Sequence, residues 1–183
     1  MRILGIDPGF ERLGIAILDP VARERRGGKN YNHRVIFSEC FKTSAKLEFS
    51  ERLHLIGKEV RKIIKEYKPE VLAIETLFLN TNQKTVMRVA EARGVVVYEA
   101  SLAGLRIFEA SPPQIKIATT GYGRANKEQI MKMVKILVET RPTEQSFGRV
   151  DETKSPPLAG QASDDEMDAI AIALTAFAYI KNL

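Results

Sequence analysis

Cysteine, histidine and long apolar runs are scarce in this chain of 183 residues, which has one cysteine, Cys40, and two histidines. One cysteine cannot form an intrachain disulfide, and neither residue type is numerous enough for a zinc cluster. We therefore expect a reducing, cytoplasmic setting. No stretch of about 18 residues is apolar and free of charge, which argues against a membrane span. The opening residues MRILGID also lack the apolar core of a secretory signal, so we expect none.

Charge is unevenly distributed along the chain, whose formal net charge is +5. Residues 1–149 carry 26 basic and 17 acidic side chains, whereas residues 150–183 carry two basic and six acidic ones. A basic body with one acidic end indicates a polyanionic partner, such as a nucleic acid, and a place that holds cations. On charge alone, an ordinary solvated surface is an equal alternative.

The first 42 residues have the pattern of three strands joined by turns. Apolar runs indicate strands at Arg2–Asp7, Leu13–Leu18 and Arg34–Lys42. Residues 19–32, between the last two, are polar and basic and contain glycine, so we expect an exposed hairpin connection there. Three consecutive strands with short connections predict an antiparallel meander.

Helices and strands alternate in the rest of the sequence, as judged from apolar spacings of three and four residues and from short apolar runs. The predicted elements are a helix at Glu48–Tyr67, a strand at Val71–Glu75, a helix from Asn82, a strand at Leu105–Glu109, helices starting at Ser111 and Asn126, and a helix at Asp164–Ile180. Residues 95–98 fit either helix or strand, and residues 141–162 should form a mobile loop. This order predicts one α/β domain over residues 1–183, with a mixed sheet flanked by helices.

Two carboxylates stand at the ends of predicted buried strands. Asp7 follows Ile3-Leu4-Gly5-Ile6, and Glu75 follows Val71-Leu72-Ala73-Ile74. A buried carboxylate without a partner is costly, so each needs either a cationic side chain or a cleft in which a metal ion neutralises it. The ends of strands are where α/β sheets open such clefts.

The last predicted helix begins with an acidic turn. Ser163 and Glu166 fit a capping box, which gives both a structural role. Asp165 and Asp168 are three residues apart and share a face of a helix that is otherwise apolar nearly all round. A favourable interaction with the helix dipole, about 0.3–1 kcal/mol for each acid, explains an inward-facing pair less well than it explains a single acid.

These four carboxylates suit a hard, oxygen-seeking cation. Mg²⁺ is the expected ion, and Mn²⁺ is possible. Two such ions support the hydrolysis of phosphodiesters without a serine or cysteine nucleophile. Paired carboxylates also serve glycosidases, but a basic body fits a phosphate backbone better than a neutral sugar.

Five segments together resemble the RuvC Holliday-junction resolvases in order and spacing. They are MRILGIDPG at residues 1–9, AIETLFLN at 73–80, AEARG at 90–94, QIKIATTGYG at 114–123 and DEMDAIAIA at 165–173. The resemblance implies a ribonuclease-H-like fold and a homodimer. It implies Mg²⁺-dependent resolution of four-way DNA junctions by two symmetric cuts during recombination and repair, and a possible branch-migration motor as partner. It makes Asp7, Glu75, Asp165 and Asp168 the catalytic, metal-binding residues.

The resemblance also assigns DNA contacts. Phe78 matches a position that probes unstacked bases, and Lys116 and Lys127 match basic residues near the cut DNA. From its place after a glycine turn, Arg124 could also reach a phosphate. The segment 90–94 matches the dimer helix of the family, which favours helix for residues 95–98. The basic hairpin at Arg23–Lys29, within residues 19–32, and the loop 141–162 are both longer than expected for the family. Each is open to two interpretations, an added DNA contact or a tolerated insertion.

Three other functions stay open at this stage. Another ribonuclease-H-like nuclease could act on RNA or on other branched DNA. An actin-like phosphotransferase would also use a GID-x-G turn, but it needs a second half that 183 residues do not provide. A junction-binding protein without activity would not need the complete carboxylate set.

Overall fold

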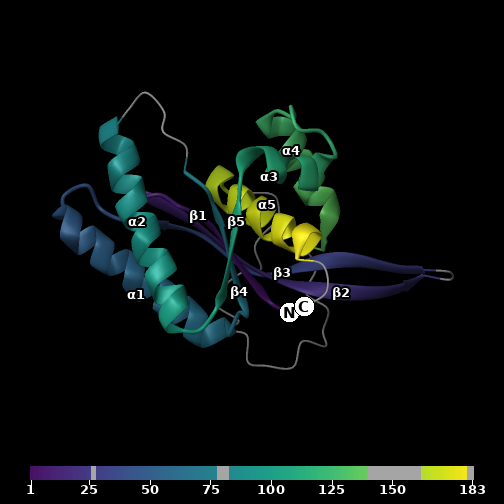
Figure 1. Ribbon diagram of the computed structural model, residues 1–183, viewed down its shortest axis with the longest axis horizontal. Coiled ribbons are helices and arrows are strands. Elements are labelled where there is room, and N and C mark those ends of the chain that lie inside the picture. The colour runs from purple at the N-terminus through teal and green to yellow at the C-terminus, as the bar shows by residue number, and fades with distance from the viewer. Residues whose placement is uncertain (26–27, 78–82, 140–161, 181–183) are drawn as a thin grey trace.

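The computed structural model of the chain describes residues 1–25, 28–77, 83–139 and 162–180, which form a mixed sheet covered by helices on both faces (Figure 1). The six strands of these residues lie in the order β5-β4-β1-β2-β3-β6. Their bounds are Ile3–Asp7 for β1, Arg12–Arg25 for β2, Gly28–Lys42 for β3, Val71–Glu75 for β4, Arg106–Ala110 for β5 and Val138–Glu139 for β6. The single domain predicted for residues 1–183 stays a prediction, because residues 140–161 lie outside the described ranges.

Strand pairing confirms the predicted meander followed by parallel strands. β1 pairs antiparallel with β2, and β2 pairs antiparallel with β3. β4 then adds to the other side of β1 in parallel, and β5 adds to β4 in parallel. The short β6, which the sequence pattern does not predict, pairs in parallel with β3 at His33 and Arg34.

The prediction of a hairpin connection at residues 19–32 is wrong, because the two strands extend through most of this range. β2 and β3 remain paired as far as Arg25 and Gly28, and they project from the body as a two-stranded arm (Figure 1). A two-stranded ribbon needs only backbone hydrogen bonds between its strands, so a polar and basic composition does not end it. The sequence signals of a solvent-exposed loop and of a solvent-exposed ribbon are therefore similar.

Two helix layers enclose the sheet, with α1 and α2 on one face and α3, α4 and α5 on the other (Figure 1). Their bounds are Phe49–Tyr67 for α1, Gln83–Leu102 for α2, Pro112–Thr120 for α3, Lys127–Leu137 for α4 and Asp164–Tyr179 for α5. α2 runs without interruption through residues 95–98, so helix is the correct alternative there. Within the described part of the chain, no helix is long and apolar enough to cross a bilayer.

Side chains alternate between the two faces along each strand, and this alternation sorts the core. Leu4 and Ile6 of β1 pack in the cluster beneath α1 and α2, whereas Ile3 packs in the cluster beneath α5. In β4, Ala73 lies on the α5 side. Asp7 and Glu75 continue the series of Ile3 and Ala73, so both belong to the face that α5 covers.

The predicted helix starts at Ser111, Asn126 and Ser163 are confirmed. Each residue is an N-cap in a capping box, with Gln114, Gln129 and Glu166 as the respective third helical residues. The prolines at the start of α3 lie in the first turn, where a missing N–H removes no helical hydrogen bond. Local side-chain chemistry therefore defines where these three helices begin.

Candidate active site

The candidate site lies where β1 and β4 end. These strands are parallel neighbours, and their last registered pair is Ile6 with Ile74. Asp7 and Glu75 each follow that pair by one residue, so they lie side by side at the same edge of the sheet. Both are partly buried, on the face that α5 covers.

Two glycines let α5 rest directly on β1 and β2. A Cβ added to Gly5 would overlap the carbonyl oxygen of Ala169, and one added to Gly14 would overlap the carbonyl oxygen of Asp165. The same hypothetical atom at Gly14 would lie 3.1 Å from Cβ of Asp7. Because Gly14 also pairs with Asp7 in the sheet, the first turn of α5 is held beside that carboxylate.

Electrostatic coupling shows that the four predicted acids share one region. The pKa of Asp7 is raised from 3.8 to about 7, first by burial and then by the negative charges of Asp168, Glu75 and Asp165, with Lys127 acting in the opposite direction. Burial, followed by the charge of Asp168, also raises the pKa of Glu75. The pKa of Asp168 is raised by burial, against the opposing charge of Lys127. Burial and negative charge therefore outweigh the nearby Lys127 at Asp7 and Asp168.

Two of the four acids have cationic partners. Asp165 forms an ion pair with Arg12 of β2, and its Oδ2 accepts a hydrogen bond of 3.3 Å from Sγ of Cys40 in β3. Nζ of Lys127 lies 3.3 Å from Oδ2 of Asp168 and 3.1 Å from a carboxylate oxygen of Asp164. Within the described ranges, neither Asp7 nor Glu75 forms an ion pair.

The donor chemistry suits a hard divalent cation, although the side chains are not gathered around one point. Carboxylate oxygens are the ligands that Mg²⁺ and Mn²⁺ prefer, and the raised pKa of Asp7 indicates a cluster that a cation would stabilise. As the side chains stand, no group of three or more His, Cys, Asp or Glu among the residues described is placed to hold an ion. Asp165 and Asp168 face Arg12 and Lys127 instead, so a shared ion requires them to exchange these partners.

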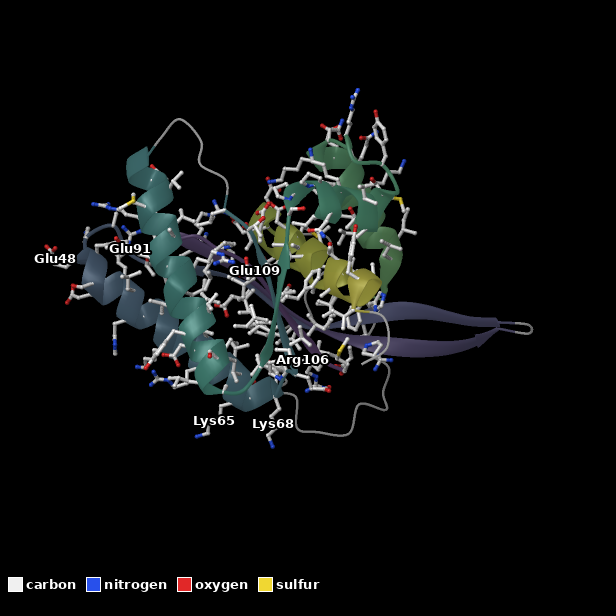
Figure 2. All side chains as sticks on the ribbon, viewed as in Figure 1. Glu48, Lys65, Lys68, Glu91, Arg106 and Glu109 are labelled. Carbon is white, nitrogen blue, oxygen red and sulfur yellow. The ribbon has the colours of Figure 1, made fainter. Side chains whose placement is uncertain are left out.

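Arg93, from the predicted AEARG motif, holds the strand ends next to the site. Its Nε donates a hydrogen bond of 3.1 Å to the backbone oxygen of Glu75. Its Nη2 lies 3.0 Å from Oε2 of Glu109, which is labelled where β5 passes α2 (Figure 2). A helix on one face of the sheet thus fixes the backbone of a strand whose terminal carboxylate points to the other face.

The predicted DNA contacts have different outcomes. Lys127, at the start of α4, lies among the acids of α5, which explains a lysine in a first turn that the helix dipole does not favour. Arg124 is exposed in the connection between α3 and α4, and Lys116 is half-buried on α3. Phe78 and residues 141–161 of the predicted loop lie outside the described residues.

Sequence reasoning missed the residues that hold the start of α5. Arg12 and Cys40 contact Asp165, and the hydroxyl of Ser38 donates a hydrogen bond of 2.7 Å to Glu166. Cys40 is half-buried, and its thiol contacts a carboxylate of the candidate site. The pairing of Gly14 with Cys40 places these side chains under α5, and strand register of this kind is not visible in the sequence.

Comparison with known proteins finds similarity over nearly the whole chain. The family described as crossover junction endodeoxyribonuclease RuvC matches residues 3–151, a range that includes Asp7 and Glu75 and ends before Asp165. The protein of that name from Caldanaerobacter subterraneus subsp. tengcongensis is 37% identical over 174 residues, or 95% of this chain and 90% of that protein. The protein of that name from Halothermothrix orenii is 38% identical over 174 residues, with the same two shares.

A solved structure has the same fold. The RuvC of Thermus thermophilus in complex with a Holliday junction substrate superposes with a TM-score of 0.77 at 28% identity. The similarity covers 98% of this chain and 94% of that one. The ribonuclease-H-like arrangement expected from the sequence is therefore also the arrangement of a protein that was solved with junction DNA.

Proposed function

Because the chain belongs to the RuvC family of crossover junction endodeoxyribonucleases, we propose that it resolves four-way DNA junctions by metal-dependent cutting of two phosphodiesters. The proposal places catalysis at Asp7, Glu75, Asp165 and Asp168. The observation that carries it is geometric: Asp7 and Glu75 end two neighbouring parallel strands, and Gly14 seats the backbone of Asp165 beside Asp7. Burial and the charges of the other three acids raise the pKa of Asp7 to about 7, in agreement with this arrangement.

The chain's own residues define what the site does. The four carboxylates would hold divalent ions, namely those of Asp7, Glu75, Asp165 and Asp168. Such ions would lower the pKa of the attacking water and stabilise the leaving oxygen. Because the pKa of Asp7 is raised to about 7, its carboxyl is only partly protonated near neutral pH. A cation can therefore replace that proton at little cost in free energy. Burial of the strand ends keeps the carboxylates in a low dielectric, which strengthens their attraction for a cation.

Basic residues around the acids would bind the phosphate backbone. Lys127 lies against Asp164 and Asp168, so its ammonium is already at the rim of the site. Arg124 and Lys116 extend the positive charge along α3 and the connection to α4. Contacts of this kind fix the DNA on the protein without reading its sequence. We assign the probing of unstacked bases to Phe78.

A homodimer would supply the second cut. The exposed side of α2 carries large apolar side chains, with Met87 64%, Tyr98 60% and Leu102 65% exposed. A twofold assembly through α2 would cover them and present two sites to a twofold junction. The branch-migration motor and the cytoplasmic setting stay predictions.

The test is a cleavage assay on a synthetic four-way junction with Mg²⁺ or Mn²⁺, using wild type, Asp7→Asn and Asp168→Asn. We expect both variants to lose cutting by at least about a hundredfold while they still retard the junction in a gel without Mg²⁺. Glu66→Gln is the matched control, because Glu66 is an exposed acid near the end of α1 and lies beside the start of β1, away from the strand end that carries Asp7. Full activity of Asp7→Asn would contradict the assigned site.

A substrate panel separates the proposal from its nearest rival. Duplex DNA, a three-way fork and an RNA–DNA hybrid of the same length accompany the four-way junction. Selective, paired cutting of the four-way junction is expected, whereas preferred cutting of the hybrid would favour a nuclease that acts on RNA. For the dimer, Tyr98→Glu should convert the sedimenting species to a monomer and leave single nicks in place of paired cuts.

A further inference from the structure

Asp165 is held differently from the other three acids. Its carboxylate has partners from two strands, the guanidinium of Arg12 in β2 and the thiol of Cys40 in β3. Both contacts reach the same oxygen, Oδ2, and the backbone of Asp165 is seated on Gly14. The residue is therefore fixed in place before any ion arrives.

The two partners differ in how easily they can leave. Cys40 is half-buried beneath the first turn of α5, and its thiol is a weak donor. The side chain of Arg12 is 52% exposed, whereas that of Asp165 is 22% exposed. A guanidinium at this edge can therefore move into solvent while the carboxylate stays where it is.

We propose that Arg12 is a positioning residue that occupies Asp165 while the site holds no divalent ion, and that it thereby weakens the site's affinity for such ions. The inference rests on the proposed function, in which Asp165 is one of the metal ligands. Arg12 acts as a built-in competitor, because an ion that binds to Asp165 must first displace this ion pair. Lys127 has the same relation to Asp168, but it also serves Asp164 and the proposed DNA surface.

The expected effect follows from the exposure of the pair. An ion pair that is half in solvent is weak, so its displacement lowers the affinity of the site for an ion only moderately. A freed guanidinium that stays nearby also repels the ion. Removing Arg12 should therefore tighten the binding of a divalent ion by about three- to tenfold.

The experiment measures Mn²⁺ binding to the complete protein without DNA, by calorimetry and by the electron paramagnetic resonance of free Mn²⁺. Arg12→Ala and Arg12→Gln should both bind Mn²⁺ more tightly, and Arg12→Lys, which keeps the charge, should restore the wild-type affinity. Lys62→Ala is the matched control, because Lys62 is 51% exposed in an ion pair on α1. Thermal unfolding of each variant confirms that it is folded.

The possible results separate the inference from the function on which it rests. If wild type binds Mn²⁺, Asp165→Asn weakens that binding and Arg12→Ala and Arg12→Gln leave it unchanged or weaker, the inference alone is wrong. If wild type binds no Mn²⁺ at millimolar concentration, the proposed metal site and the inference are both overturned. Tighter binding by Arg12→Ala together with Lys62→Ala would indicate a general charge effect and would also overturn the inference.

Discussion

Asp7→Asn should make the metal-free protein more stable at neutral and alkaline pH, even though it removes a central residue of the site. The folded protein raises the pKa of Asp7 from 3.8 to about 7. The folded state therefore holds this proton more tightly than the unfolded chain. The stabilising effect of the proton is complete below pH 3.8, and it is lost as the pH rises to about 7.

The size of the effect follows from the shift. Each pKa unit corresponds to about 1.4 kcal/mol, so the ionised Asp7 costs the folded state about 4 kcal/mol above pH 7. At pH 5 the same relation gives a cost to the folded state of about 1.5–2 kcal/mol. Asparagine carries no charge to bury, so the variant avoids this cost, and about 4 kcal/mol is an upper limit because burial of the amide also costs free energy. For a chain of this length, that limit corresponds to a rise in Tm of about 10 °C.

The assay is urea and thermal unfolding of wild type and Asp7→Asn at pH 5 and pH 8 in EDTA. The stability gain of the variant should be larger at pH 8 than at pH 5, by about 2–3 kcal/mol. Glu66→Gln, an exposed acid on α1, provides the comparison for a neutralised carboxylate away from the site. An Asp7→Asn protein that is less stable than wild type at pH 8, or that has the same pH slope, would refute the claim that burial and the neighbouring acids raise the pKa of Asp7.

Three further predictions concern the support of the site and its DNA surface. Gly14→Ala should lower the free energy of unfolding by at least about 3 kcal/mol in chemical denaturation, because the new Cβ overlaps the backbone of Asp165; a loss below about 1 kcal/mol would mean that α5 moves freely. Asn126→Ala should cost about 1 kcal/mol in the same measurement, since the side chain caps α4, and Asn126→Asp should retain most of the stability. Arg124→Ala should weaken junction binding and reduce the slope of log affinity against log salt by about 1, and an unchanged slope in a titration from low to high salt would show that Arg124 touches no phosphate.

The positions of Asp7 and Glu75 at strand ends are predictable from the sequence, because each is a charge at the end of an apolar run. A parallel sheet then brings such ends to one edge. Asp165 and Asp168 are predictable because two acids on one face of an apolar helix have no simple structural role. In each case the argument uses only local periodicity and the cost of burying charge.

Contacts that depend on register could not be predicted in the same way. Arg12 meets Asp165 only because β2 pairs with β1 and β3 in one particular alignment beneath α5, and a shift of one residue would turn it to the other face. The continuation of β2 and β3 into the arm, and the short β6, depend on backbone pairing between segments that carry little apolar pattern. Helix at residues 95–98 reflects packing of α2, which overrides the strand propensity of consecutive valines.

Gly5 and Gly14 put the helix that carries half of the carboxylates in direct backbone contact with two strands. At these points no side chain lies between the helix and the strands. Substitutions in the rest of the core therefore do not change the helix–strand distance there. The spacing between these two strands and the start of α5 is therefore set by backbone contact at these points and not by the packing of side chains.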